Sequence, residues 1–155
     1  MTLNRRKFLA AGAALGATAS IAAPTSPLPF LIQMQSDPLL PNAKGKRVLI
    51  CGGGWGGVTA AKYLRKLDPS LEVVLLERNP VFFSCPMSNK WLVDVVDVQF
   101  LTHDYLAVSE KYDYRFIQTE ILEIERDRRT VLTAAGSITY DYLILAPGIR
   151  YNYEA

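Results

Sequence analysis

The chain has 155 residues, of which half are apolar and about a fifth are charged. This length and composition suit one globular domain with a core, and they exclude a disordered chain or two ordinary domains. The formal charge is +2, but the part after residue 23 has 14 Lys and Arg against 15 Asp and Glu. With that balance nothing in the composition indicates nucleic-acid binding, so we expect no nucleic-acid partner.

The first 23 residues are predicted to be an export signal. Basic residues precede a mild apolar run from Phe8 to Ala23, which is shorter than the ~20 residues of a membrane-spanning helix. The paired arginines in "RRKFL" indicate a twin-arginine signal, so we expect the twin-arginine export machinery as a partner and a periplasmic location. The alternatives are an ordinary secretory signal and an uncleaved anchor.

The boundary between leader and folded domain is expected at Lys46. Residues 24–45 are rich in proline and end in "PNAKG", which is typical of a linker. Residues 46–155 then form the predicted domain.

The domain opens with a predicted strand, helix and strand. "RVLIC" (47–51) is a short apolar run bounded by glycine, as in a buried parallel strand. "VTAAKYLRKL" (58–67) repeats apolar residues at helical spacing, and Asp68-Pro69 is expected to end that helix. "LEVVLLE" (71–77) is a second buried strand. This order predicts a right-handed βαβ unit.

The remaining segments predict more sheet. Residues 90–111 suggest one or two short helices, and "YRFIQ" (114–118) suggests a third strand. Residues 120–140 alternate apolar and polar side chains with turns at 127–128 and 135–136, which predicts an antiparallel meander laid over the parallel sheet. "DYLILAPG" (141–148) is expected to be a last buried strand.

A glycine box follows the first strand. Gly52 allows a tight turn, Gly54 allows a pyrophosphate to approach the backbone, and Gly57 allows close packing of helix and strand. Glu77, 20 residues after the last glycine, stands where it can accept hydrogen bonds from both ribose hydroxyls of an adenosine. The spacing predicts a dinucleotide site in a Rossmann-like α/β domain, and the alternative is a glycine-rich turn without a ligand.

The end of the chain favours FAD over NAD as the dinucleotide. Residues 119–148 resemble the meander and closing strand of disulfide-reductase-type FAD domains, in which a small residue, Thr or Pro, and Gly lie near the flavin diphosphate. The matching residues here are Ala146, Pro147 and Gly148. We therefore expect these three residues to join the glycine box and Glu77 in holding FAD.

The stretch after the second strand carries a more specific likeness. An aromatic pair, Ser or Thr, Cys, and then Ser-Asn are matched by Phe82, Phe83, Ser84, Cys85, Ser88 and Asn89. With "HDYLAV" and "YDYLILAPGI", this motif resembles the flavoprotein subunit of flavocytochrome c sulfide dehydrogenase. The resemblance covers roughly residues 44–151. It implies that the sulfur of Cys85 is bonded to the 8α-methyl group of the flavin.

The residues alone leave the role of Cys85 open. A loop that leaves the second strand lies over the ligand-binding edge of the sheet, where a tether to the flavin is sensible. The alternative is a free, half-buried thiol packed between Phe83 and Pro86. Cys51, at the end of a buried strand, is interpreted as a small core residue, and a disulfide with Cys85 is not assumed.

The resemblance implies a reaction that needs more chain than this one. In that family, sulfide attacks a disulfide formed by two later cysteines, and electrons pass through FAD to haem in a c-type cytochrome subunit. We therefore expect the redox cysteines beyond residue 155, and we assign no catalytic residue and no metal site to this chain. It is interpreted as the N-terminal, truncated part of the flavoprotein. His103 is expected on a helix surface or at a helix cap.

Two other functions remain open from the sequence. The chain could be a fragment of a sulfide:quinone or NADH:quinone reductase, which belong to the same superfamily. It could also be a nucleotide-binding module without turnover.

Overall fold

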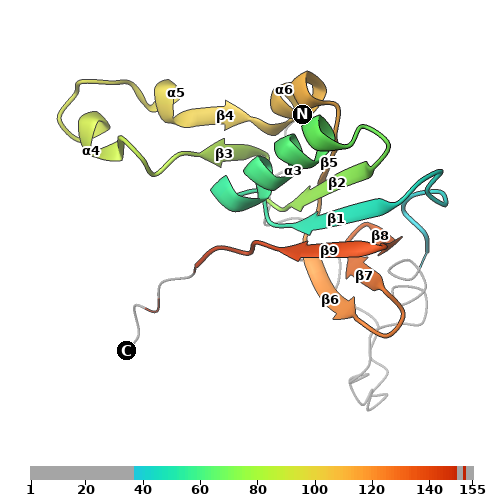
Figure 1. The fold of residues 1–155 in the computed structure, drawn as a ribbon. Helices are drawn as coiled ribbons and strands as arrows, with labels where there is room; N and C mark the ends of the chain where they lie inside the picture. Colours follow the sequence, from blue (N-terminus) through green and yellow to red (C-terminus); the bar gives the residue numbers. More distant parts are fainter. Residues whose placement is uncertain (1–36, 150–151, 153–155) are drawn as a thin grey trace, which may run out of the picture.

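The computed structural model describes residues 37–149 and 152 (Figure 1). The predicted export signal and most of the predicted linker lie outside the described residues. The elements are, in order, β1 (Arg47–Cys51), α3 (Trp55–Leu67), β2 (Glu72–Glu77), β3 (Val81–Phe83), α4 (Ser88–Trp91), α5 (Val98–Leu101), β4 (Thr102–Asp104), α6 (Tyr105–Tyr112), β5 (Arg115–Gln118), β6 (Ile121–Glu125), β7 (Thr130–Thr133), β8 (Gly136–Thr139) and β9 (Tyr142–Leu145).

Four parallel strands form the central sheet, in the order β5-β2-β1-β9. All four were predicted: β1 has the predicted ends, the ends of the other three differ by at most three residues, and the βαβ unit is confirmed. The helix α3 begins at Trp55, three residues before its predicted start, and ends before Asp68, as predicted. Because the strands are parallel, the turns after β1, β2 and β9 meet at one edge of the sheet (Figure 1).

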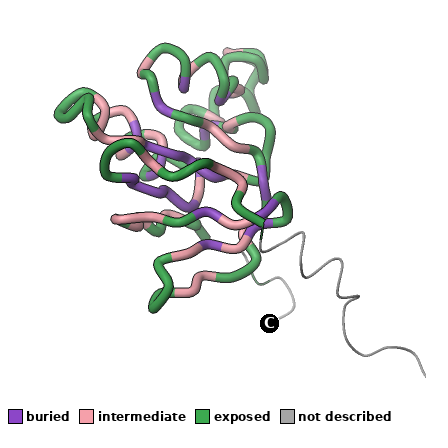
Figure 2. Tube along the Cα trace, turned by 90° about the vertical axis from the view of Figure 1, so that its right-hand side faces the viewer, coloured by how far each residue is buried: buried purple, intermediate pink, exposed green. Residues whose placement is uncertain are grey.

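Both faces of this sheet are covered, which makes three layers. Alternate residues of a strand point to opposite faces. Val48 and Ile50 of β1 face a cluster with Ala61 of α3, whereas Leu49 and Cys51 face the meander. Figure 2 shows the buried residues gathered along the central strands. The predicted α/β class, with a meander on one face of a parallel sheet, is confirmed, and Cys51 is a buried core residue as interpreted.

The meander consists of β6, β7 and β8, paired antiparallel in chain order. Val131 and Ile138 pack from it onto the parallel sheet. The start of the described chain also belongs to this layer: the Leu39 amide donates to the Ser137 carbonyl at 2.8 Å, and the Ser137 amide donates to the Asp37 carbonyl at 2.7 Å. The part of the predicted linker that can be seen therefore pairs with β8 before the chain reaches β1.

An arm, residues 81–104, projects beyond the carboxyl ends of β1 and β9 (Figure 1). Its base is the antiparallel pair β3–β4, which was not predicted. The expected position of His103 was wrong: it lies in β4 opposite Phe82, and the two rings stack with 6.0 Å between their centres. No residue from 85 to 100 is buried, although many of them are apolar. The arm thus has little core of its own.

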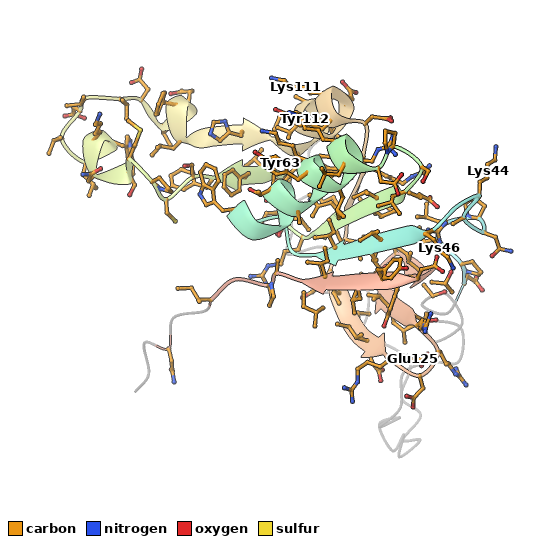
Figure 3. All side chains as sticks on the ribbon, viewed as in Figure 1. Lys44, Lys46, Tyr63, Lys111, Tyr112 and Glu125 are labelled. Atoms are coloured by element: carbon orange, nitrogen blue, oxygen red, sulfur yellow. The ribbon has the colours of Figure 1, made fainter. Side chains whose placement is uncertain are left out.

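Lysine and tyrosine side chains make cation–π contacts where the outer faces of α3 and α6 meet. The Lys62 ammonium lies 5.3 Å from the centre of the Tyr63 ring and 5.0 Å from that of Tyr112. The Lys111 ammonium lies 5.6 Å from the centre of the Tyr112 ring (Figure 3). Such contacts stabilise an exposed seam modestly. Among the described residues, no helix has the length and apolar character needed to cross a membrane.

Candidate functional site

The turn between β1 and α3 can be built only from glycine at two places. Gly52 has a φ of +109°, and a Cβ there would lie 2.1 Å from the Ala146 carbonyl oxygen. A Cβ on Gly57 would lie 1.8 Å from the Gly52 carbonyl oxygen, far inside contact distance. The first glycine therefore permits the backbone turn and the last permits the close approach of helix to strand, as the sequence predicted.

The amino end of α3 is open toward the carboxyl edge of the sheet. Gly54 is the N-cap, and a Cβ on it would meet nothing within 4 Å. No side chain caps this helix, and its first turn has no acidic residue. The first amides of a helix lack partners within it and favour an anion. An open glycine before uncapped amides fits the diphosphate of a dinucleotide.

Glu77 lies at the end of β2, beside this turn. Its Oε2 accepts from the Gly53 amide at 2.8 Å, and its Oε1 accepts from the amide and the side chain of Asn79 at 2.9 and 2.7 Å. A carboxylate accepts about four hydrogen bonds, so roughly one position remains for a ribose hydroxyl. Binding both hydroxyls, as the sequence predicted, would require Asn79 to release one of its bonds.

The closing turn after β9 lies directly against the glycine turn. The Ala146 amide donates to the Cys51 carbonyl at 2.8 Å, and the Ala146 carbonyl faces Gly52. Gly148 has a φ of +75°, and a Cβ there would meet nothing within 4 Å. The structure thus brings together the glycine box, Glu77 and Ala146, which are distant in sequence. The ligand-binding roles of Ala146, Pro147 and Gly148 stay predictions.

Cys85 begins a tight turn on the arm. The Ser88 amide donates to the Cys85 carbonyl at 3.1 Å, and Met87 has a φ of 69° and a ψ of 5°. With Pro86 in second place, these angles define a type II turn, although the left-handed position is usually Gly or Asn. Ser84 is buried just before it, and the Ser84 amide donates to the Leu101 carbonyl at 2.8 Å.

The half-buried alternative for Cys85 was wrong, because the residue is exposed. Its thiol is on an exposed turn and does not pack between its neighbours. The residue before the turn, Ser84, is hydrogen-bonded to Leu101 on the other side of the arm. The arm contacts the glycine turn through Phe82, whose ring meets that of Trp55 edge to face with 5.2 Å between centres. Cys85 therefore lies three residues beyond a direct contact with the start of α3.

Two residues at this site were not predicted. Asn79 holds Glu77, and an Asn two residues after an acid was the available signal. Tyr105 donates from its hydroxyl to the Gly53 carbonyl at 2.8 Å and is buried. No local pattern indicated that contact, because 52 residues separate its partners.

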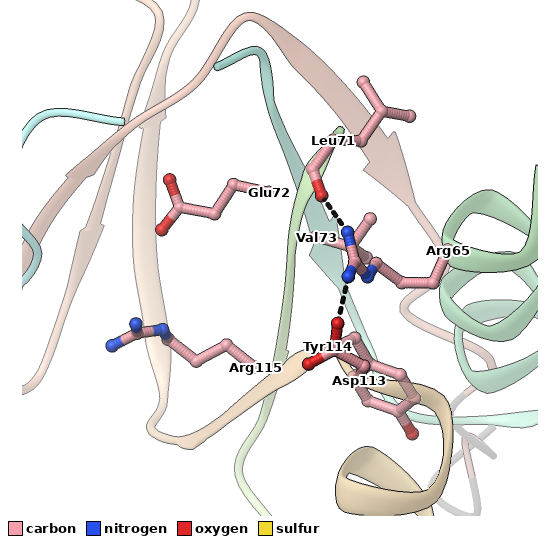
Figure 4. Close-up of a pocket in the computed structure, with 7 residues that line it drawn as sticks. All are labelled: Arg65, Leu71, Glu72, Val73, Asp113, Tyr114 and Arg115. Carbon is pink, nitrogen blue, oxygen red and sulfur yellow. Dashed lines mark hydrogen bonds and ion pairs between the residues drawn. The ribbon is translucent and has the colours of Figure 1, made fainter. Parts of the chain in front are cut away.

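A charged hollow of about 380 Å³ lies at the opposite edge of the sheet, at the amino ends of β2 and β5 (Figure 4). Arg65 donates to the Pro69 and Leu71 carbonyls at 2.5 and 2.7 Å and forms an ion pair with Asp113. Its guanidinium thus ties α3 to the loops at that edge. This hollow is remote from the glycine turn and has no part in the site described above.

We expect iodoacetamide at pH 8 to modify Cys85 and to spare Cys51 in the folded chain. Only a thiolate reacts, and burial raises the pKa of Cys51 to about 11, so roughly one Cys51 in a thousand is ionised at pH 8. Cys85 is exposed. Peptide mass spectrometry before and after denaturation measures both sites. Equal labelling of the two cysteines in the folded chain would contradict the buried position of Cys51.

Known proteins share this arrangement. Residues 46–153 match the family described as pyridine nucleotide-disulphide oxidoreductase. The chain is 59% identical over 44 residues to the flavoprotein chain of sulfide dehydrogenase (flavocytochrome c) from Chlorobaculum thiosulfatiphilum; the match covers 28% of this chain and 92% of that sequence. It is 32% identical over 111 residues to the sulfide-quinone reductase of Aquifex aeolicus (strain VF5), covering 71% of this chain and 26% of that protein.

The fold is also found in a solved relative. The X-ray structure of the sulfide:quinone oxidoreductase from Aquifex aeolicus superposes with a TM-score of 0.67 and 29% identity, over 72% of this chain and 26% of that one. The chain therefore spans about a quarter of the length of that reductase. These matches confirm the predicted Rossmann-like class of the domain.

Proposed function

The chain belongs to the pyridine nucleotide-disulphide oxidoreductase family, and from that premise we propose that it is the FAD-binding part of a flavoprotein that oxidises sulfide. Members of this family are flavin-dependent oxidoreductases, and the relatives above include a sulfide dehydrogenase and a sulfide-quinone reductase. The observation that supports sulfide dehydrogenase is the 59% identity to a flavocytochrome c flavoprotein chain.

The described residues would hold the diphosphate and the adenosine ribose of FAD. The open amides at the start of α3, next to Gly54, would receive the diphosphate. Glu77 would accept a hydrogen bond from the adenosine ribose, and its charge would repel a 2′-phosphate. Gly148, which faces open space in the closing turn, would lie along the same diphosphate. When bound, FAD would supply the two-electron acceptor that these side chains lack.

We further propose that Cys85 tethers the flavin through a thioether to its 8α-methyl group. The thiol is exposed on a turn of the arm, which projects from the same edge of the sheet as the glycine turn (Figure 1). Forming that bond removes one proton from the thiol and one from the methyl group, and it leaves two electrons on the ring for an oxidant such as dioxygen. A tether would prevent loss of the cofactor outside the cytoplasm.

The proposed setting has two separate supports. The flavocytochrome c relative suggests the cytochrome partner, and the "RRKFL" at residues 5–9 suggests export. The protein would be exported folded by the twin-arginine machinery to the periplasm, where a c-type cytochrome subunit would accept electrons. The two cysteines of this chain are one buried and one exposed free thiol, so they do not form a redox disulfide. The cysteines that react with sulfide would therefore belong to a further part of the protein, and we expect no sulfide turnover from this chain alone.

We expect acid-precipitated protein, produced in the cytoplasm, to retain yellow flavin absorbance in the pellet. A thioether survives acid denaturation, whereas every non-covalent contact described above is lost. The Cys85→Ser variant should release all its FAD to the supernatant while binding it before denaturation. The absorbance of pellet and supernatant near 450 nm, where flavins absorb, measures how much flavin is covalently bound and how much is released.

The Cys51→Ser variant is the matched control, because Cys51 is buried in the core cluster that faces the meander. It should keep flavin in the pellet if it folds. Release of all FAD by the unmodified chain would reject the thioether. Absence of flavin before denaturation would reject FAD binding by this chain as a whole.

A sulfide:quinone reductase is the second candidate. Its support is the longer match, 32% identity over 111 residues, together with the superposition on the Aquifex aeolicus structure. FAD that binds tightly but leaves the acid pellet completely would favour this candidate over the first.

A further inference from the structure

The central peptide units of the glycine turn are held from both sides. The Gly53 amide donates to Glu77 at 2.8 Å, and the Gly53 carbonyl accepts from the Tyr105 hydroxyl at 2.8 Å. Gly53 is one of the variable positions of the glycine box, so its identity carries no ligand-binding signal. Its two hydrogen bonds nevertheless fix the orientation of the backbone on either side of it.

The bond from Tyr105 sets the direction of the next amide. The Gly53 carbonyl and the Gly54 N–H belong to one peptide unit, and no cis peptide is present in the described chain. In a planar trans unit the C=O and N–H point in opposite directions. Because Tyr105 binds the carbonyl from the core side, the Gly54 N–H points away from the core. A Cβ on Gly54 would also meet nothing within 4 Å, so a ligand has room beside this residue.

Tyr105 is itself firmly placed. It is the first residue of α6, and the Asp104 side chain caps that helix by accepting from the Leu106 amide at 2.9 Å. The Tyr105 ring stacks on Phe116 with 4.8 Å between centres and meets Phe82 at 6.3 Å. Tyr105 is 3% exposed, so water does not compete for its hydroxyl. The Tyr105 side chain therefore supports the glycine turn from the core side, at Gly53.

We propose that Tyr105 is a positioning residue for the diphosphate: it aims the Gly54 amide at the ligand and keeps it aimed before the ligand arrives. The proposal rests on the proposed dinucleotide site. It assigns to a residue outside the glycine box a part in phosphate binding. Phe82 contacts both Tyr105 and Trp55, so the same residue links the base of the arm to the turn.

The test compares two buried tyrosines. Tyr105→Phe removes the hydroxyl bonded to Gly53, whereas Tyr114→Phe removes a buried hydroxyl that has no hydrogen-bond partner. FAD, ADP and adenosine are titrated into each folded chain and followed by NMR chemical shifts, which also detect weak binding. We expect Tyr105→Phe to raise the Kd for FAD and ADP about tenfold and to leave that for adenosine unchanged. Tyr114→Phe should leave all three within about twofold of the unmodified chain.

The outcomes separate this proposal from the one it rests on. Equal affinities of Tyr105→Phe and the unmodified chain for ADP, or an equal loss for adenosine, would overturn the positioning role while leaving the dinucleotide site intact. No binding of FAD or ADP by the unmodified chain would overturn both. If Tyr105→Phe does not fold, the proposal is tested instead on the unmodified chain, by the NMR signal of the Tyr105 hydroxyl proton with and without ADP. That signal should shift when ADP binds, and an unchanged signal would reject the proposal.

Discussion

The Gly57→Ala chain is expected to be less stable by about 3 kcal/mol and to lose FAD binding. The added Cβ would lie 1.8 Å from the Gly52 carbonyl oxygen, which is backbone and has no rotamer to change. Helix α3 must therefore move away from β1, and overpacking of this kind typically costs 1–3 kcal/mol, occasionally more. Moving the helix also displaces the amides at its start. Urea unfolding followed by circular dichroism measures the stability, and FAD titration measures the binding.

Gly56→Ala is the matched control for this substitution. A Cβ there would be 3.8 Å from the Ala146 side chain, an ordinary contact, and Gly56 is an exposed helical residue. Replacing an exposed helical glycine by alanine usually stabilises a helix by about 0.5–1 kcal/mol. A Gly57→Ala chain as stable as Gly56→Ala would mean that helix and strand are not packed as closely as described.

The Gly54→Ala chain should fold normally and bind FAD at least about 100-fold more weakly, a loss of about 2.7 kcal/mol in binding. Nothing in the protein lies within 4 Å of the new methyl group, and the φ of −68° suits alanine. The stability should therefore fall by no more than about 1 kcal/mol, because alanine is a poorer N-cap than glycine. The methyl group would occupy the space through which a diphosphate reaches the helix amides.

Isothermal titration with FAD and urea unfolding of the same preparation test this separation of binding from folding. Tyr114→Phe serves as the control for FAD affinity, since Tyr114 lines the hollow at the opposite edge of the sheet. Unchanged FAD affinity in Gly54→Ala would show that the phosphates do not pass over Gly54. The pair Gly57→Ala and Gly54→Ala thus distinguishes a glycine needed by the fold from one needed by the ligand.

Much of the central fold was predictable from the sequence because its signals are local. The strands β1 and β2 are continuous apolar runs, as strands buried on both faces must be, and they end at glycine or at a charged residue. The start of α3 was misplaced because Gly56 and Gly57 have low helix propensity, so the helical pattern becomes visible only at Val58. Packing against the turn overrides that propensity.

The arm and part of the site could not be predicted because they depend on distant pairings. The strands β3 and β4 have three residues each, which is too short for alternation to be recognised, and they pair across the whole arm. The bond between Tyr105 and Gly53 likewise joins separate elements. The glycine box and Glu77 were predictable because their chemistry fixes their spacing, whereas the residues that brace them can come from anywhere in the chain.

The contrast between sheet and arm bears on how a long ligand would bind. Leu49 and Ile50 of β1 are completely buried, whereas residues 85–100 include no buried side chain. A segment with so few internal contacts opens locally at little cost in free energy. The phosphates of a dinucleotide would thus bind to a turn that is rigid before the ligand arrives. The flavin ring would bind next to an arm that can change its conformation. Immobilising the adaptable part would appear as an unfavourable entropy of association.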